Sequence, residues 1–474
     1  GFPGSNPRDI TFFQEARKLK LRHARLAAFG STRRAGVKAA EDLQLRTLLD
    51  SGMPVMTIVG KTWNLHVTEI LRTTLEENLA MIEDSARHLV AEGREVIYDA
   101  EHFFDGFKSD ADYALRTLAA AVRGGASNLT LCDTNGGSLP AEVAAATRAA
   151  IAALKKTPVG IHTHDDAGLG LANALASLEA GASHVQGTVN GIGERTGNCD
   201  LTAVIPCAQL KFGWKCVSST SLKGLAGLSR FVDGVANLAP DPRRPWVGTA
   251  AFAHKGGTHV DAVRKFSAAY EHVDPTVVGN ERTVLVSDQS GRSNIVLKAK
   301  SLGIDLDRDS PATATALDEL KKLEHGGWSF EDAEASLALL LRRHIGKSKA
   351  APFEVASYHV TARGAKGSAY CEAVVRLSIA GKETLTVAEG DGPVHALDQA
   401  LRSALVKSFP KLAKVSLVDY KVRILGGADG TAAKTRVVIR SSDGKASWGT
   451  VGVSENLVEA SLQAIVDGYA HALS

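Results

Sequence analysis

The stretch of residues 159–201 limits most strongly what this chain can fold into. An apolar run ends in His162-Thr163-His164, a helical pattern rich in Ala and Leu follows, and a second apolar run covers residues 184–189. This second run opens into a glycine-rich turn that ends at Asn198. Strand, helix and strand in this order predict a parallel βαβ unit. Since side chains alternate along a strand, the two histidines at its carboxyl end point to the same side.

These polar side chains favour a site for a divalent metal ion. Two imidazoles on one side can share a cation, and the turn can bring Asn198 to the same edge. Hydrogen bonds to carbonyl groups or water are the structural alternative for a His-x-His pair. Gly191, Gly193 and Gly197 permit close backbone approach within the turn.

Four charged residues flank the metal candidates. Asp165 and Asp166 follow the histidines directly. They either orient the metal ligands or favour the N-terminus of the next helix through their charge. Glu194 and Arg195 lie inside the glycine-rich turn, and we expect them to brace it and not to react.

The same alternation of apolar runs and amphipathic helices extends upstream. We expect strands at residues 25–29, 54–59, 95–98, 128–132, 159–162 and 184–189, and helices at 35–50, 75–89, 110–122 and 140–154. Apolar strands separated by such helices predict a parallel sheet covered by helices. We interpret this part as an α/β fold of the TIM (β/α)8 type, which keeps its chemistry at the carboxyl ends of its strands.

Composition excludes several other classes of protein. A length of 474 residues allows two or three domains, and a net charge of +3 implies no polyanionic partner. No basic tract with interleaved aromatic residues indicates nucleic-acid binding. No apolar run approaches the roughly 20 residues of a membrane helix. The five scattered cysteines form no CxxC pair, which favours a reducing cytoplasm over a disulfide framework.

Longer phrases carry a resemblance to a known enzyme family. HTHDD, followed one βα unit later by GIGERTGN, is similar to the paired motifs of the α-isopropylmalate, homocitrate and citramalate synthases. VGKTWNLHVTE, YDAEHFFDGFK and GGTHVDAVRK resemble the citramalate branch, and the resemblance covers nearly the whole chain. The family condenses acetyl-CoA with an α-keto acid and then hydrolyses the thioester. This chemistry needs a divalent metal, a base and donors to a developing oxyanion.

The resemblance implies a metal site made by His162, His164 and, as a weaker oxygen ligand or water-mediated partner, Asn198. The choice among Zn, Mn and Mg stays open. The family's barrel has a first strand with an Arg-Asp pair that binds metal and substrate, and no such LRDG motif occurs here. Residues 1–3 resemble the tail of the second strand. We therefore expect either a fragment of a longer protein or a site that binds metal weakly.

The resemblance also implies catalytic and substrate-binding residues. Glu101 would be an acid or base, with Asp99 or His102 as alternatives for that position and a solvated loop charge as the structural alternative. His259 and Tyr270 would reach the site from a linker subdomain, either of this chain or of a partner subunit. Thr134 would bind the keto acid's carboxylate, with a hydroxyl closing a turn as the alternative. Tyr98 would line the pocket for the alkyl group of the substrate.

Three domains are expected: a catalytic barrel over residues 1–238, linker subdomains over 239–350 and a regulatory domain over 351–474. In the last part three strands and a helix occur twice, which predicts a duplicated α+β domain. Residues 346–351 are expected to be a linker. The resemblance implies a homodimer in which an end-product amino acid, isoleucine, binds at the interface of the regulatory domains.

Three functional hypotheses follow. The first is condensation of acetyl-CoA with pyruvate and water to citramalate and CoA, for isoleucine biosynthesis in the cytoplasm. The second is the isopropylmalate synthase reaction, with 2-ketoisovalerate as the acceptor for leucine biosynthesis. A third, from another class, is a catalytically inactive module that binds an amino acid and dimerises. Lyase chemistry on the same site is disfavoured because the duplicated domain resembles feedback control of a biosynthetic step.

Overall fold

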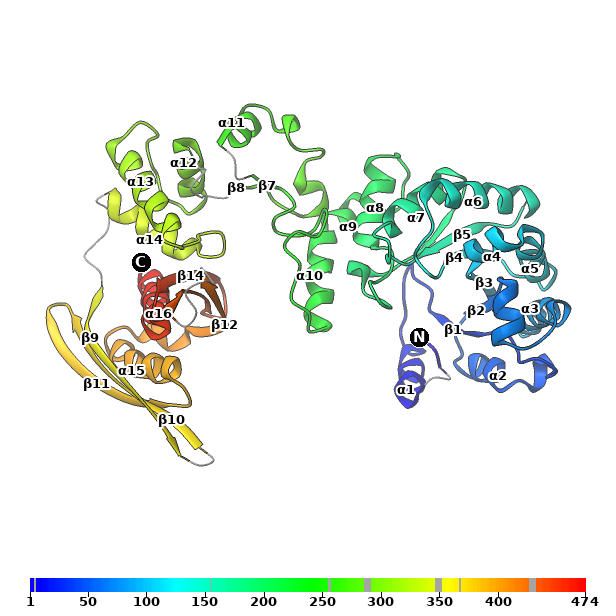
Figure 1. Ribbon diagram of the computed structural model, residues 1–474, viewed down its shortest axis with the longest axis horizontal. Helices are drawn as coiled ribbons and strands as arrows, with labels where there is room; N and C mark the ends of the chain where they lie inside the picture. Colours follow the sequence, from blue (N-terminus) through cyan, green and yellow to red (C-terminus); the bar gives the residue numbers. More distant parts are fainter. Residues whose placement is uncertain are drawn as a thin grey trace. The chain divides into compact units, whose positions relative to one another are not determined.

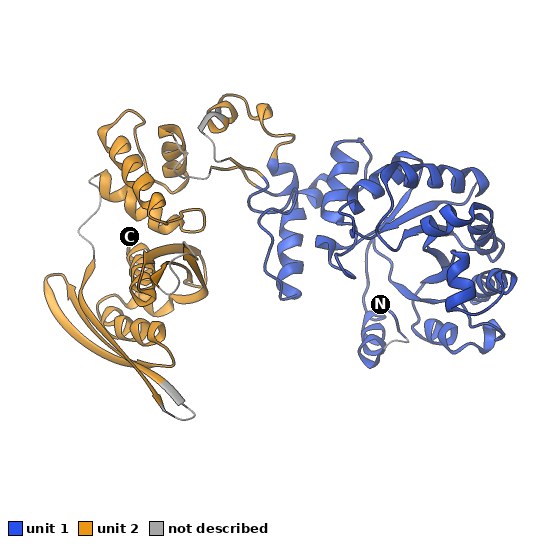
Figure 2. Cartoon of the chain, viewed as in Figure 1, with its two compact units in different colours: residues 1–251, 275–280 blue, residues 252–274, 281–474 orange. Residues whose placement is uncertain are grey.

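The chain divides into two compact units, coloured separately in Figure 2. One unit holds residues 1–251 and 275–280, and the other holds residues 252–274 and 281–474. The computed structural model describes residues 1–3, 6–154, 156–254, 257–284, 291–345, 352–365, 368–425 and 432–474. The linker expected at residues 346–351 lies outside this part. Each unit is described by itself.

A six-stranded parallel sheet organises the first unit (Figure 1). Its strands lie in the order of the sequence: β1 (Ala27–Ser31), β2 (Val55–Lys61), β3 (Glu95–Glu101), β4 (Asn128–Asp133), β5 (Val159–Thr163) and β6 (His184–Gln186). Every neighbouring pair is parallel. The expected α/β fold with a parallel sheet is therefore confirmed, and the carboxyl ends of all six strands lie along one edge, here called the mouth.

Helices connect these strands and cover the sheet. They are α1 (Pro7–Ala16), α2 (Leu43–Asp50), α3 (Leu75–Ala91), α4 (Phe103–Ser109), α5 (Ala111–Arg123), α6 (Pro140–Leu154), α7 (Gly170–Glu179) and α8 (Leu201–Leu210). Shorter turns of helix are η1 (Ala39–Glu41), η2 (His66–Ile70) and η3 (Val189–Gly191). Further along come α9 (Ser219–Lys223), α10 (Leu225–Val235) and η5 (Pro275–Val278).

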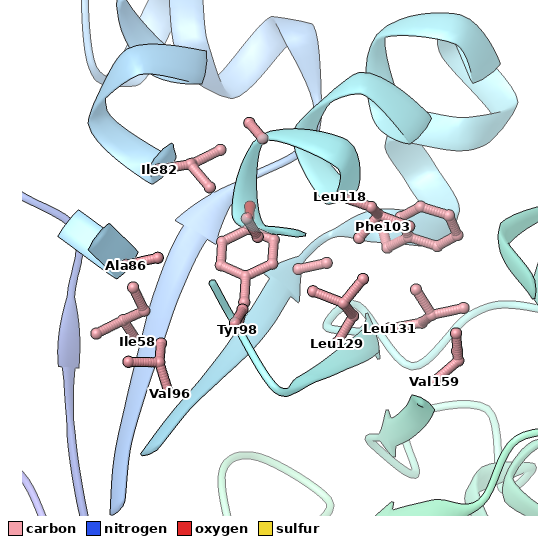
Figure 3. Close-up of a cluster of buried hydrophobic side chains, with 14 of the residues drawn as sticks. Ile58, Ile82, Ala86, Val96, Tyr98, Phe103, Leu118, Leu129, Leu131 and Val159 are labelled. Atoms are coloured by element: carbon pink, nitrogen blue, oxygen red, sulfur yellow. The ribbon is translucent and has the colours of Figure 1, made fainter. Parts of the chain in front are cut away.

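The core of this unit fills the space between the sheet and its helices. Val96 and Tyr98 of β3 are fully buried there with Ile82 of α3 and Leu118 of α5 (Figure 3). Ala100 of β3 is fully buried in the same cluster. These β3 residues are two positions apart, so they share one face of the strand. The intervening positions of β3, among them Asp99, face the other way, toward the interior of the barrel.

One expected helix is shorter than its apolar pattern indicated. The pattern over residues 35–50 yields α2 only from Leu43 onward. The reason is Asp42, whose buried carboxylate accepts hydrogen bonds from the backbone N–H groups of Gln44 and Leu45 and so begins the helix there. Gly36, with φ of 71°, keeps the preceding segment out of helical geometry.

The second unit begins with small helical elements and ends in two antiparallel sheets. The first part holds β7 (Ala253–His254), α11 (Gly257–Lys265), η4 (Ser267–Ala269), β8 (Thr283–Val284), α12 (Arg292–Ser301), α13 (Pro311–His325) and α14 (Glu334–His344). The second part holds β9 (Phe353–Ala365), β10 (Ser368–Ile379), β11 (Lys382–Gly390), α15 (Pro393–Ser408), η6 (Pro410–Lys414), β12 (Ser416–Leu425), β13 (Lys434–Ser442), β14 (Ser447–Ser454) and α16 (Leu457–Leu473). Within the described residues, no helix has the length and hydropathy to span a membrane.

The expected duplication of three strands and a helix is present in both halves of this second part. Each half is a three-stranded antiparallel sheet, β9 to β11 and β12 to β14, and each ends in a long helix. One hydrogen bond between a strand and its helix also occurs at the equivalent place in both halves. The Thr386 hydroxyl of β11 donates to Ala400 O of α15 at 2.9 Å, and the Thr450 hydroxyl of β14 donates to Ala464 O of α16 at 2.7 Å. The same sequence offset separates the members of both pairs, which indicates a duplicated unit.

Candidate active site

Two imidazoles lie side by side at the carboxyl end of β5. The Nε2 atoms of His162 and His164 are 3.2 Å apart. The other ring nitrogen of His162, Nδ1, lies 2.9 Å from Gln186 Oε1 at the end of β6. Burial lowers the pKa of both imidazoles. Both rings are therefore neutral near pH 7, the state in which imidazole binds a metal.

The glycine-rich turn after β6 carries Asn198 to this histidine pair. Asn198 Nδ2 lies 3.1 Å from His162 Nε2, and the backbone of Asn198 forms an antiparallel bridge with that of His164. The backbone N–H of Asn198 also donates to Gly191 O at 3.0 Å. Gly193 leaves room for the carboxamide, since a Cβ atom there would stand 1.7 Å from Asn198 Oδ1. The structure thus brings the three expected metal-binding residues together.

These side chains fit a divalent cation. Two nitrogen atoms bound to one ion at about 2.0–2.1 Å, with an angle of about 90–110° at the ion, are about 2.9–3.4 Å apart. The distance of 3.2 Å between the two Nε2 atoms falls within that range. Among the described residues, the buried Nδ1 atom of His164 has no hydrogen-bond partner, so no hydrogen bond fixes the tautomer of this ring. Two neutral imidazoles and a carboxamide form an uncharged donor set. Over the described ranges no group of three or more His, Cys, Asp or Glu is arranged to hold a metal ion. Asn198 must rotate its amide to offer its oxygen.

Arg195 braces the turn against two neighbouring loops. Its Nε and Nη2 atoms each donate to the Asp166 carboxylate at 2.7 Å, and Nη2 also donates to Thr134 O at 2.7 Å. Asp165 instead accepts from the N–H of Gly170, the first residue of α7, at 2.7 Å. Asp165 therefore stabilises the N-terminus of α7, one of the two roles considered from the sequence. Asp166 instead binds Arg195.

Glu101 ends β3 at the same mouth. Its carboxylate forms an ion pair with the ammonium group of Lys61, which ends β2, and each side chain is about one quarter exposed. The backbone N–H of Thr62 donates to Glu101 O at 3.3 Å, which fixes the strand end. Glu101 is thus held at the mouth by a cation and is not a freely solvated charge. The role of Lys61 was not apparent from the sequence.

Thr134 and a group of aromatic rings lie beside Glu101. The Thr134 hydroxyl oxygen accepts from the backbone N–H of His102 at 2.9 Å, and none of the described residues accepts its own hydrogen. His102 has the left-handed φ of 57°, and its Nδ1 lies 3.3 Å from an Asp105 carboxylate oxygen. The His66 ring stacks on Trp63 and lies 4.2 Å from the His102 ring, centroid to centroid. These rings lie in the phrases VGKTWNLHVTE and YDAEHFFDGFK, but no firm role could be assigned to them from the sequence.

Tyr98 does not belong to the mouth, contrary to the expectation. Its side chain is fully buried between the sheet and its helices, where its ring packs among aliphatic side chains (Figure 3). The physical reason is the alternation of side chains along β3. Since Glu101 faces the mouth, Asp99 shares its face and Tyr98 does not. The interior position that the sequence analysis assigned to Tyr98 is held by Asp99.

His259 and Tyr270 lie in the second unit. Their rings are stacked with centroids 4.3 Å apart, and both side chains are exposed. The two expected catalytic residues from the linker subdomain therefore stand next to each other. The structure describes each unit by itself, so the place of this pair relative to the mouth stays a prediction.

Comparisons with known proteins match three successive regions of the chain. The HMGL-like family model matches residues 1–232. The model described as homocitrate synthase post-HMGL domain-like matches residues 246–326. The model of the LeuA allosteric (dimerisation) domain matches residues 331–473.

Similar proteins extend over the full length of the chain. An (R)-citramalate synthase from Aquifex aeolicus is 49% identical over 100% of this chain and 90% of its own length. One from Synechocystis sp. is 47% identical over 100% of this chain and 88% of its own length. A probable 2-isopropylmalate synthase from Methanopyrus kandleri is more distant, with 30% identity over 89% of this chain and 81% of its own length.

Proposed function

The chain belongs to the (R)-citramalate synthase family, and from this premise we propose that it joins acetyl-CoA to pyruvate at the mouth of the sheet. The methyl carbon of the acetyl group bonds to the keto carbon of pyruvate. Water then cleaves the thioester, and the products are citramalate and CoA. The observation that carries the proposal is the convergence of His162, His164 and Asn198 at the end of β5.

We assign a divalent metal ion to these three residues. When bound, such an ion polarises the keto group of pyruvate and holds its carboxylate. His162 and His164 supply neutral nitrogen ligands, and Asn198 supplies an oxygen directly or through water. Imidazole ligands favour Zn²⁺ over Mg²⁺. Thr134 lies at the same edge, and its free hydroxyl hydrogen suits a substrate carboxylate.

Proton transfer is assigned to Glu101, His259 and Tyr270. The Glu101 carboxylate, held at the mouth by Lys61, is placed to remove or return a proton. The stacked pair of His259 and Tyr270 offers a ring nitrogen and a hydroxyl on an exposed surface of the second unit. We propose that this pair acts on the acetyl-CoA thioester or the developing alcohol, from this chain or from a partner subunit.

The acceptor keto acid is tested by the release of CoA. The chain is incubated with acetyl-CoA, Mn²⁺ or Zn²⁺ and either pyruvate or 2-ketoisovalerate, and free thiol is measured. We expect a higher kcat/KM with pyruvate, because relatives at 47–49% identity carry the citramalate synthase name and the isopropylmalate synthase stands at 30%. A preference for 2-ketoisovalerate would reverse the assignment.

The same assay tests the hypothesis of an inactive module. Removal of divalent metal by a chelator should abolish CoA release, and return of the metal should restore it. CoA release that is absent with every keto acid and metal would favour the alternative in which the chain only binds an amino acid and dimerises.

Regulation and assembly are assigned to the C-terminal part. We propose a catalytic barrel over residues 1–238, linker subdomains over 239–350 and a regulatory domain over 351–474. The LeuA allosteric (dimerisation) domain model over residues 331–473 supports a homodimer. Isoleucine is the proposed effector, and inhibition of CoA release by isoleucine but not by leucine would test it.

Five free cysteines support a reducing cytoplasm as the compartment.

A further inference from the structure

A line of three hydrogen-bonded side chains runs from the interior of the sheet to the metal site. Asp99 of β3 accepts from Gln186 Nε2 of β6 at 2.8 Å. Gln186 Oε1 in turn lies 2.9 Å from His162 Nδ1. Asp99 is only 4% exposed, so the line begins at a buried carboxyl group. Such a buried polar line needs consistent donors and acceptors along its whole length.

With Asp99 ionised, the donors and acceptors in this line have one consistent assignment. The ionised carboxylate only accepts, so it selects the amide nitrogen of Gln186 and leaves the carbonyl oxygen for His162. Thr130 adds a second acceptor, since its hydroxyl lies 3.2 Å from the same amide nitrogen. The opposite amide orientation would place two oxygens, those of Gln186 and Asp99, against each other in a buried site.

The state of His162 follows from the amide orientation. Gln186 Oε1 only accepts, so His162 Nδ1 must carry the ring proton. The Nε2 atom of a neutral ring is then bare and faces His164 Nε2 and Asn198 Nδ2, at 3.2 and 3.1 Å. A bare Nε2 is what a metal ligand requires.

We propose that Asp99 and Gln186 are positioning residues that fix the Nδ1-protonated tautomer of His162 and thereby present its Nε2 lone pair to the metal. The part of this inference that concerns metal rests on the proposed function. The part that concerns the tautomer holds for the metal-free protein.

The test uses three variants in the full chain. Gln186→Leu removes the acceptor at nearly constant volume, and Asp99→Asn removes the group that orients the amide. The double variant Asp99→Asn/Gln186→Glu reverses the polarity of the line, because an asparagine amide then donates to a glutamate that still accepts from His162 Nδ1. A structural role alone would not make the double variant better than either single variant.

The first readout is the tautomer of His162 in metal-free protein labelled with ¹⁵N in its histidine rings. The resonances are assigned with His162→Gln, and one-bond and long-range ¹H–¹⁵N spectra identify which nitrogen carries the proton. We expect Nδ1–H in the parent chain and the double variant, Nε2–H in Gln186→Leu, and a mixture in Asp99→Asn. An unchanged Nδ1–H tautomer in Gln186→Leu would overturn the proposal.

The second readout is the dissociation constant for Mn²⁺, measured from the free-ion signal in electron paramagnetic resonance. Loss of an outer hydrogen bond to a metal-bound histidine weakens binding by roughly 10–100-fold, and we expect this for Gln186→Leu with recovery in the double variant. Thr147→Val is the matched control, because it removes a buried hydrogen bond to Ser177 in the helical layer. It should leave both readouts unchanged. Absence of Mn²⁺ binding in the parent chain would count against the proposed function, and the tautomer spectra would still decide the present inference.

Discussion

At the scale of single residues, the carboxyl group of Asp99 is buried and makes hydrogen bonds that can orient a neighbouring side chain. Its neighbours in hydrogen bonding are an amide and a hydroxyl, and burial raises the pKa of Asp99 to about 7. A carboxyl group in such surroundings is destabilising when charged, and proteins keep one where it serves a purpose. The purpose we infer is the orientation of Gln186.

The stability of the first unit should fall with rising pH on account of Asp99. Its pKa is about 7 in the folded chain and 3.8 ordinarily. Below pH 3.8 both states hold the proton and there is no effect. Between pH 3.8 and about 7 the unfolded chain loses the proton first, so unfolding becomes easier. The full loss is at most about 4 kcal/mol and is present above pH 7.

The variant Asp99→Asn should lack this pH dependence. Urea unfolding at pH 5 and pH 8 is the measurement. The free energy of unfolding of the variant, relative to the parent chain, should be higher at pH 8 than at pH 5. A difference that does not change with pH would contradict the prediction.

Gly193 should be intolerant of even one methyl group. In Gly193→Ala the new Cβ would stand 1.7 Å from Asn198 Oδ1, so the carboxamide must leave the histidine pair. We expect CoA release to fall by up to about 100-fold, the loss that a misplacement of a catalytic group by about 1 Å can cause. The matched control is Gly137→Ala, since a Cβ at Gly137 meets nothing within 4 Å. Equal activities of the two variants would refute the role given to Gly193.

At the scale of elements, the sequence was a good guide to strands and a weaker one to their ends. The alternation of apolar runs and amphipathic helices predicted the six parallel strands, because buried parallel strands are nearly continuous in apolar residues. β3 was expected to end at residue 98 and continues to Glu101. The reason is that its last inward positions are polar, so the apolar pattern stops before the strand does.

The site was predictable where a motif marked it and not where only the fold assembled it. His162, His164 and Asn198 were found because two short motifs contain them. Gln186 was not found, and Lys61 stood in a quoted phrase without a role, since each gains its role from a strand that is distant in the sequence. The available signal was the presence of polar residues at inward positions of otherwise apolar strands.

Arg195 should determine the rigidity of the glycine-rich turn. Arg195→Lys keeps the charge but loses the two parallel hydrogen bonds to Asp166. The pair is partly exposed, so we expect only a small effect, roughly fivefold faster amide hydrogen exchange in residues 190–198. Hydrogen-exchange mass spectrometry measures this rate. Arg123→Lys, which weakens an exposed ion pair with Glu83 between helices, should leave the turn unaffected.

At the scale of the whole molecule, the chain combines two kinds of fold. The first unit gathers its chemistry along one edge of a parallel sheet, and the second repeats a small antiparallel sheet with a helix. The repeat was predictable because its period in the sequence is regular. The position of His259 and Tyr270 relative to the mouth was not predictable, since it depends on how separate units meet.

The duplicated hydroxyls should stabilise both halves of the C-terminal part in the same way. Thr386→Val and Thr450→Val each remove one hydrogen bond between a strand and its helix. We expect a loss of about 0.5–1.5 kcal/mol for each, larger for the fully buried Thr450 than for the half-buried Thr386. Native-state hydrogen exchange of α15 and α16 measures the two effects separately. A loss confined to one half would show that the halves are not energetically equivalent.

The strand β3 has a consequence for how such an enzyme can change. Val96, Tyr98 and Ala100, at even-numbered positions, pack in the apolar core, and Asp99 and Glu101, at odd-numbered positions, make polar contacts on the opposite face. Substitutions in one set can therefore alter reactivity while the other set preserves the scaffold. Insertion or deletion of a single residue within the strand would exchange the two sets and destroy both at once.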